Sequence, residues 1–151
     1  MVKILEVDPK NNTEALELLE ELSNSLEAVT GNSGKASFNL EDMDKPRSVF
    51  VLAMDKDGKA AGCGAIRPIS SDTAEVKRMY ARAKGKGTGS DILAYLEKKA
   101  KAFGYSRLLL ETRAVNEGAV RFYKRNGYQV RENYGKYEGN KEAVCFEKSL
   151  G

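Results

Sequence analysis

Residues 73–103 read TAEVKRMYARAKGKGTGSDILAYLEKKAKAF, and the order of patterns in this segment is the most informative feature of the chain. Residues 73–81 predict a β-strand, and Lys84–Gly89 is a Gly-rich turn. Apolar residues then recur at helical spacing over residues 92–103, and Gly104 is placed to end that helix. This order predicts an anion site, because a helix leaves its first N–H groups unpaired and glycines let phosphate oxygens approach.

Strand and helix patterns alternate on both sides of this segment. Asp57-Gly58 predicts a hairpin turn, and Gly62 and Gly64 in the following strand predict a bend or a close approach by another backbone. Further strands are predicted over residues 2–7, 48–54, 60–66, 108–112, 128–131 and 143–148. Thr13 and Asn116 are each expected to cap a helix, and the apolar face of the first helix is expected to carry Leu16, Leu19, Leu22 and Leu26. The order β-α-ββ-β-α-β-α-ββ predicts an α/β (α+β) fold, a mixed sheet with helices on both faces.

Length and composition predict one domain over residues 1–151. The chain has 151 residues, of which 31% are charged and 41% hydrophobic, the balance of a folded globular protein. It contains no histidine, which excludes a Ser-His-Asp or Cys-His nucleophile pair and any zinc site that needs imidazole. Cys63 and Cys145 lie in apolar runs and are expected to be buried thiols, so no metal is expected.

Charge and hydropathy exclude further classes. The net charge of +3 is too small to indicate a nucleic-acid partner, and no window has the length of a signal peptide or a membrane span. Without a disulfide framework, a reducing cytoplasm is the expected location. The sequence leaves the oligomeric state open, and a homodimer is compatible with it.

Two nucleotide-binding motifs do not fit the Gly-rich turn. A Walker A loop needs Gly, four residues and then Gly-Lys-Ser/Thr, which no segment supplies. A dinucleotide fingerprint needs G-x-G-x-x-G after a first strand, whereas this stretch is G-x-G-x-G in the middle of the chain.

The segment Glu75–Tyr80 followed by Lys84–Gly89 resembles the central motif of the GNAT acetyltransferase superfamily, usually written Arg/Gln-x-x-Gly-x-Gly/Ala. Lys84, Gly87 and Gly89 fit this motif with Lys in the basic position. A second register, which starts at Arg82, fits it literally, but the first places Leu93 and Leu96 on the apolar face of the family's helix. The link between Tyr80 and Lys84 is shorter than the family's usual form.

A second motif supports the resemblance. Residues 116–123, NEGAVRFY, and the following Asn126-Gly127-Tyr128 are similar to the family's N-x-x-A-x-x-x-Y segment. Residues 145–148 resemble its closing strand. The match in element order runs over nearly the whole chain and implies a mostly antiparallel sheet of about six or seven strands.

The resemblance implies transfer of an acetyl group from acetyl-CoA to a primary amine by direct attack in a ternary complex. The pyrophosphate is expected on the backbone amides of the turn, and the pantetheine arm along the edge of the strand, as an added strand would lie. The residues implied in binding acetyl-CoA are Met79, Tyr80, Ala81, Lys84, Gly85, Lys86, Gly87, Thr88, Gly89, Ser90, Asn116 and Tyr123.

Catalytic candidates follow from the same resemblance. Tyr123 lies seven residues after Asn116, on the same helix face, and its hydroxyl is the candidate acid for the CoA thiolate. The base must be a carboxylate, since there is no histidine; Glu75 is the first candidate and Glu111 the alternative.

The acceptor pocket is expected between the loops at 30–47 and 134–137. The acidic residues Glu41, Asp42 and Asp44 would suit a cationic substrate, but a solvated surface explains them equally well. Two other functions stay open. The domain could bind acyl-CoA as a sensor without turnover, or its lysines over residues 84–101 could bind a polyanion, although no aromatic platform for bases accompanies them.

Overall fold

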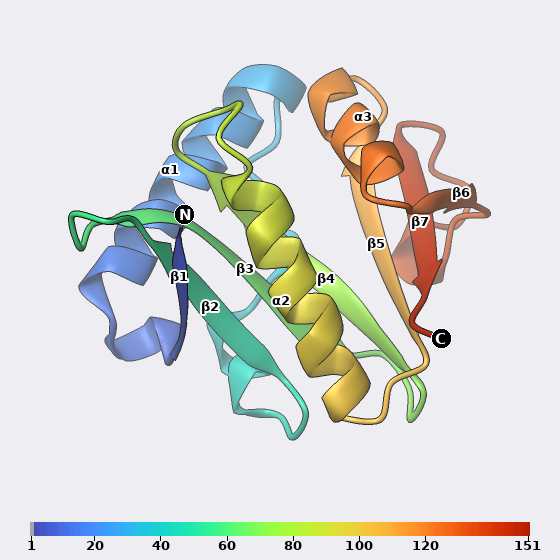
Figure 1. Cartoon of the computed structure of the whole chain (residues 1–151). Helices are drawn as coiled ribbons and strands as arrows, with labels where there is room; N and C mark the ends of the chain where they lie inside the picture. Colours follow the sequence, from blue (N-terminus) through green and yellow to red (C-terminus); the bar gives the residue numbers. More distant parts are fainter. Residues whose placement is uncertain (1) are drawn as a thin grey trace.

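The computed structural model describes residues 2–151 and contains one seven-stranded sheet in the order β1-β2-β3-β4-β5-β7-β6 (Figure 1). Only β4 and β5 run parallel; every other neighbouring pair is antiparallel. The strands are β1 (Lys3–Val7), β2 (Val49–Met54), β3 (Ala60–Pro68), β4 (Thr73–Ala81), β5 (Arg107–Arg113), β6 (Gln129–Arg131) and β7 (Ala143–Ser149). The predicted mixed, mostly antiparallel sheet is confirmed.

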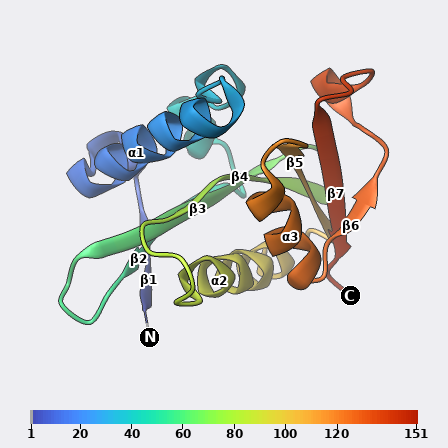
Figure 2. The ribbon, with the colours of Figure 1, turned by 90° about the horizontal axis from the view of Figure 1, so that it is seen from above.

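Three α-helices cover the two faces of this sheet. Figure 2 shows α1 (Thr13–Thr30) on one face, and α2 (Thr88–Ala102) with α3 (Glu117–Arg125) on the other. Short 3-10 turns lie at Pro9–Asn11, Lys35–Ser37, Leu40–Asp44 and Gly135–Tyr137. No helix within residues 2–151 has the length and apolar character needed to cross a bilayer.

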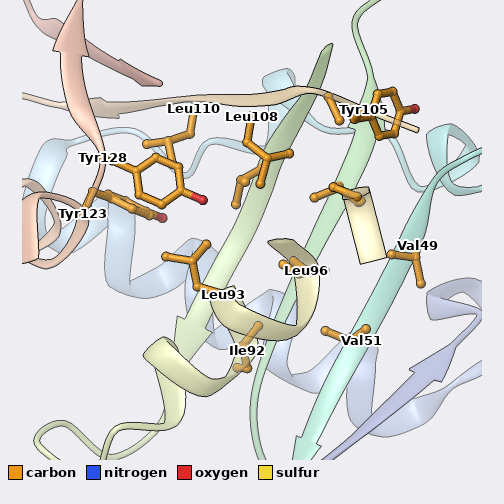
Figure 3. Close-up of a cluster of buried hydrophobic side chains, with 14 of the residues drawn as sticks. Val49, Val51, Ile92, Leu93, Leu96, Tyr105, Leu108, Leu110, Tyr123 and Tyr128 are labelled. Atoms are coloured by element: carbon orange, nitrogen blue, oxygen red, sulfur yellow. The ribbon is translucent and has the colours of Figure 1, made fainter. Parts of the chain in front are cut away.

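The core forms two layers because successive strand residues point to opposite faces. In β2, Val49 and Val51 pack in the cluster beneath α2, while Phe50 and Leu52 pack with α1. The cluster beneath α2 and α3 is shown in Figure 3 and includes Leu93, Leu96, Leu108, Leu110 and Tyr123.

The start and the buried face of α1 differ from the sequence prediction. Asn12, rather than Thr13, caps the helix, because its side-chain oxygen accepts a hydrogen bond from the Ala15 amide at 2.9 Å. Leu16, expected on the buried face, is 43% exposed, and Leu18 is fully buried instead. The buried positions therefore follow Ala15, Leu18, Leu19 and Leu22.

Strands β4 and β5 pair only at their starts. Their ladder has the rungs Thr73↔Arg107, Ala74↔Leu108 and Glu75↔Leu109, and then the strands diverge (Figure 1). From residue 76 onward, the edge of β4 that faces β5 therefore has no strand partner. The free edge is flanked by α3 and by the loop before β7.

A bulge in β4 changes the direction of its side chains. Arg78 has φ +56°, and the register with β3 shifts between Cys63 and Ala65. As a result, Lys77 and Arg78 both reach segments on the α1 side of the sheet. Gly62 and Gly64 make room opposite the bulge, since a Cβ at Gly62 would lie 2.5 Å from the Tyr80 carbonyl oxygen. This confirms the close backbone approach predicted from the two glycines.

We expect Gly62→Ala to destabilise the protein by about 1–3 kcal/mol, because the added methyl group meets a backbone carbonyl that cannot rotate away. Gly118→Ala in α3 is the matched control, since nothing lies within 4 Å of a Cβ built there. Urea unfolding of both variants measures the difference. Equal unfolding midpoints for the two variants would contradict the steric argument.

Candidate functional site

A cavity of about 350 Å³ opens where β4 and β5 diverge. Its walls come from the C-terminal end of α1 with the following loop, from residues 76–79 of β4, residues 111–113 of β5, the start of α3, and the loop between β6 and β7. The predicted acceptor loops at 30–47 and 134–137 both reach it, through Asn32, Ser37 and Tyr137 among others.

The Gly-rich turn delivers the unpaired amides of a helix start. Gly87 is the N-cap of α2, with φ +78°, and has no side chain that could cap the helix. The Asp91 amide donates to the Gly87 carbonyl and so makes the first hydrogen bond of the helix. Gly85 and Gly87 have open space around them, whereas a Cβ at Gly89 would lie 3.1 Å from the Phe122 ring. The amides of Thr88, Gly89 and Ser90 are thus available to an anion.

The basic residues of this turn divide into two groups. Arg82 forms an ion pair with Glu21 at 2.6 Å and donates to the Ala60 carbonyl at 2.8 Å. Lys84 and Lys86 are exposed. This division favours the motif register that begins at Lys84, because Arg82 already has protein partners.

The predicted residues of β4 contribute in two ways. The Met79 side chain lines the cavity. Tyr80 points to the opposite side, where its hydroxyl donates to Glu21 at 3.3 Å, and Ala81 pairs with Gly62 of β3. The Tyr80 and Ala81 side chains therefore do not line the cavity, and the Tyr80 carbonyl oxygen faces Gly62 of β3.

Asn116 and Tyr123 meet at the same cavity from one face of α3. Asn116 caps the helix by accepting from the Ala119 amide at 3.3 Å, as predicted. The Tyr123 ring packs against the Tyr128 ring (Figure 3), with the ring centroids 5.8 Å apart. It also packs against the Phe146 ring, with the centroids 5.9 Å apart. Burial raises the pKa of the Tyr123 hydroxyl, which keeps it protonated at neutral pH.

The two candidate bases occupy different environments. Glu75 forms an ion pair with Arg67 at 2.9 Å and accepts from the Tyr134 hydroxyl at 2.6 Å, and it is not among the residues that line the cavity. Glu111 does line it. Within residues 2–151 the buried Glu111 Oε2 has no hydrogen-bond partner, and Arg113 Nε lies 4.0 Å away. Burial raises the pKa of the Glu111 carboxyl.

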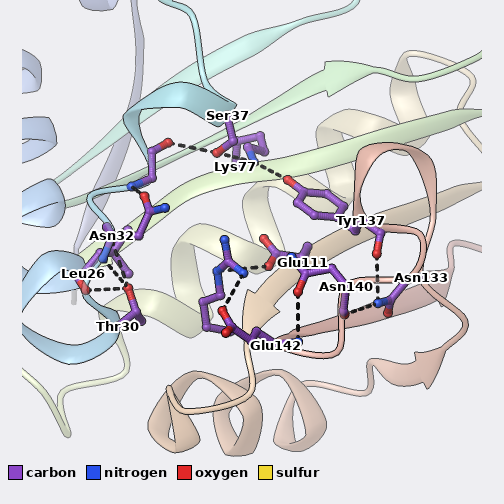
Figure 4. Close-up of polar contacts among 12 residues, drawn as sticks. Leu26, Thr30, Asn32, Ser37, Lys77, Glu111, Asn133, Tyr137, Asn140 and Glu142 are labelled. Carbon is purple, nitrogen blue, oxygen red and sulfur yellow. Dashed lines mark hydrogen bonds and ion pairs between the residues drawn. The ribbon is translucent and has the colours of Figure 1, made fainter.

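Lys77 is a cavity residue that the sequence analysis missed. It is only 8% exposed, and its ammonium group donates to Ser37 Oγ at 3.2 Å and to the Tyr137 hydroxyl at 3.3 Å (Figure 4). Burial lowers the pKa of Lys77 to about 8. A lysine in the middle of a predicted strand, next to the apolar Val76, is the signal that could have identified it.

The acidic run of the 30–47 loop does not line this cavity. Asp42 forms ion pairs with Arg67 at 2.6 Å and Lys45 at 3.2 Å, and Asp44 pairs with Lys10. Glu41 lies at a separate open hollow. The residues that would have suited a cationic substrate are thus used elsewhere.

Both cysteines are buried, as expected. Burial raises the pKa of the Cys63 thiol to about 12, and it raises the pKa of Cys145 as well. Neither thiol is poised to be a thiolate nucleophile.

We expect Lys77→Met to raise the free energy of unfolding at pH 7, because folding then no longer desolvates an ammonium group. The pKa of Lys77 is about 8 in the folded chain, below its ordinary value of 10.5. Between pH 8 and pH 10.5 the unfolded chain therefore binds more protons than the folded chain. The destabilisation caused by burying Lys77 therefore declines as pH rises from about 8 toward 10.5. The stability that Lys77→Met gains over the wild type declines over the same pH range.

Urea unfolding at several pH values, with Lys98→Met on the exposed face of α2 as the matched control, measures this dependence. A loss of stability at pH 7 in Lys77→Met alone would contradict it.

Comparison with known proteins agrees with this geometry. The model of the acetyltransferase (GNAT) family matches residues 15–128. An "IAA acetyltransferase" of Azospirillum brasilense is 31% identical over 138 residues, covering 89% of this chain and 90% of the relative. The uncharacterized N-acetyltransferase YsnE of Bacillus subtilis is 27% identical over 150 residues, covering 97% and 99%.

Solved structures show the same fold. A Klebsiella pneumoniae protein described as an acyl-CoA N-acyltransferase has a TM-score of 0.83 and 28% identity, covering 100% of this chain and 99% of its own. An aminoglycoside 6'-N-acetyltransferase in complex with coenzyme A has a TM-score of 0.69 at 19% identity, covering 99% and 97%. With its divergent β4 and β5, its Gly-rich helix start and these matches, the chain belongs to the GNAT acetyltransferase family.

Proposed function

We propose that the protein is an acetyl-CoA-dependent N-acetyltransferase that acetylates a primary amine by direct attack in a ternary complex. One observation carries the proposal. The free edge of β4 begins beside the cavity at Met79, and the chain leads from the end of β4 into the Gly-rich turn and the start of α2 at Lys84–Ser90. One extended ligand can therefore contact both the cavity and the helix start.

The coenzyme lies along that edge. Its pyrophosphate accepts hydrogen bonds from the amides of Lys84–Ser90, with Lys84 and Lys86 adding positive charge. The pantetheine arm pairs with the backbone of Met79, Tyr80 and Ala81, as an added strand would. Asn116, whose oxygen is used by the helix cap, has its amide NH₂ left for the same arm.

The acetyl group then moves to the amine in one displacement. The substrate ammonium first loses a proton to become a nucleophile, and the nitrogen lone pair attacks the thioester carbonyl carbon. The C–S bond breaks with its electron pair on sulfur, and the Tyr123 hydroxyl protonates the thiolate. The second nitrogen proton leaves as the amide forms and replaces the proton that Tyr123 gave to sulfur. Of the two protons lost by the substrate nitrogen, one therefore goes to solvent and the other, by way of Tyr123, to CoA.

Glu111 is the better base for the nitrogen protons. Its Oε2 lacks a hydrogen-bond partner at the cavity wall, and burial raises the pKa of its carboxyl toward the working range of a base. Glu75, the first candidate from the sequence, has its oxygens occupied by Arg67 and Tyr134. We therefore assign Glu75 a positioning role, in which it holds the side chains of Arg67 and Tyr134 in place.

We expect Tyr123→Phe to lower kcat by about 10²–10⁴-fold, because it removes the proton donor and keeps the ring that packs on Tyr128. Thiol release measures the rate, and calorimetric titration with acetyl-CoA measures binding, which should stay within a few-fold of the wild type. Tyr128→Phe is the control, since the Tyr128 hydroxyl donates to Glu97 rather than lining the cavity. Binding of acetyl-CoA without any turnover in the wild type would instead indicate a sensor domain.

We expect Glu111→Gln to lower kcat/KM by about 10²–10⁴-fold and to remove the rise of kcat/KM with pH through the carboxyl pKa. That rise exists in the wild type because only the ionised carboxylate accepts a proton. Glu75→Gln is the comparison variant: it should keep the pH-dependent limb. Loss of that limb in Glu75→Gln and its survival in Glu111→Gln would assign the base to Glu75.

A further inference from the structure

The charged side chains that line the cavity are mostly cationic. They are Lys77, Arg78, Arg113 and Lys136, with Glu111 as the only carboxylate among the lining residues that the structure describes. Arg78 reaches the carbonyls of Leu19 and Ser33, at 3.5 and 3.4 Å, and Arg113 lies near Glu142 and Glu111. Arg113 is therefore the one lining cation in residues 2–151 with carboxylates within 4 Å. Lys77, Lys136 and Arg78 have none at that distance, and Lys77 differs from Arg78 in that it bonds only hydroxyl oxygens.

The lack of a counter-ion at Lys77 is unusual for a group buried this deeply. A buried ammonium group normally has a carboxylate partner, yet its only hydrogen-bond partners in residues 2–151 are two neutral hydroxyl oxygens (Figure 4). Glu75 stands on the same strand and on the same face, two residues earlier, but it bonds Arg67 and Tyr134. The fold therefore pairs Arg67 directly with carboxylates, whereas Lys77 has none within 4 Å in residues 2–151 and interacts with Glu75 and Glu111 only at longer range.

Strand register places Lys77 opposite Glu111. The last paired rung joins Glu75 to Leu109, and Lys77 and Glu111 each lie two residues further along their strands, on the same face. The strands diverge beyond that rung, and both side chains line the cavity of about 350 Å³ that opens there. One wall of the gap offers a carboxylate and the other an ammonium group.

We propose that the acceptor is a small amine that carries a carboxylate, an amino acid in chemical class, with its carboxylate bound by Lys77 and its amine at Glu111. This inference rests on the proposed function. Tyr137 and Ser37 hold the Lys77 ammonium group in place through their hydroxyl oxygens. Lys136, on the same loop as Tyr137, adds a second positive charge at the exposed rim.

The coenzyme does not account for the free charge of Lys77. Its phosphates belong at Lys84–Ser90, beyond the end of β4 at Ala81, whereas Lys77 lies four residues before that end and its side chain lines the cavity. The acetyl group and the thioester carry no negative charge. A carboxylate on the acceptor is the partner that remains.

The test compares acceptors that differ only in the carboxylate. The panel consists of the common amino acids, each paired with its decarboxylated amine, such as phenylalanine with phenethylamine and lysine with cadaverine. Thiol release and mass spectrometry of the acetylated product give kcat and KM. We expect the wild type to prefer the carboxylated member by about 10- to 100-fold in kcat/KM, the range of a charge-assisted hydrogen bond.

Variants assign that preference to one side chain. Lys77→Met should remove it by raising KM for the amino acid, with a smaller effect on the paired amine, although the variant folds at least as stably as the wild type. Lys98→Met on the exposed face of α2 should keep the preference. A variant that is merely misfolded would lose both acceptors together, and this pattern would overturn the assignment to Lys77.

Three results would overturn the inference while leaving the proposed function intact: acetyl-CoA binding with a preference for the decarboxylated amines, binding with transfer to no carboxylated amine, or an unchanged preference in Lys77→Met. Intact-mass analysis adds a fourth, because acetylation of Lys77 itself would make it an acceptor instead of a binding group. Failure to bind acetyl-CoA at all in calorimetric titration would instead sink the proposed function.

Discussion

The divergence of two parallel strands is the constraint on which the site depends. β4 and β5 share three rungs of hydrogen bonds and then separate, which leaves the polar backbone edge of β4 without a partner in the middle of a sheet. Unpaired backbone groups are costly unless water or a ligand satisfies them, so this edge is a natural place for an extended ligand to bind. The cavity, the start of α3 and the loop before β7 all surround this gap.

The bulge in β4 determines which side chains face the gap. A regular strand would send Lys77 and Arg78 to opposite faces, but the positive φ of Arg78 puts both on the α1 side. Gly62 and Gly64 permit this geometry, because side chains there would collide with Tyr80 and Met79. The bulge and the two glycines are therefore one structural device, with parts on neighbouring strands.

Charge at the cavity is arranged at a cost to stability. Burying the Lys77 ammonium group against two hydroxyl oxygens is unfavourable, and the sheet could have paired it with Glu75. Glu75 instead joins Asp42 in neutralising Arg67, which ties the loop after α1 to β3 and β4. Buried charged groups of this kind cluster at functional sites, and Lys77 and Glu111 both line the cavity between the diverging strands β4 and β5.

Local features were predictable from the sequence because they depend on residues close together in the chain. The Gly-rich turn before α2, the cap at Asn116 and the shared face of Asn116 and Tyr123 all follow from spacing, and the structure confirms each placement. The order of the elements, and the presence of helices on both faces of the sheet, follow from the alternation of strand-like and helix-like spacing of apolar residues along the chain. Misplaced details, such as Leu16 on the buried face of α1, arise where several residues fit the same helical period.

Only the tertiary structure decided how distant segments divide the charged groups among themselves. Nothing near Glu75 in the sequence shows that Arg67 and Tyr134 occupy it, and nothing near Glu111 shows that its Oε2 is left without a partner. Lys77 looks like an ordinary strand residue until the loops carrying Ser37 and Tyr137 fold over it. Spacing along the chain specifies the elements and the Gly-rich turn, whereas the cavity wall that carries Lys77 and Glu111 is made by contacts between strands and loops that are far apart in sequence.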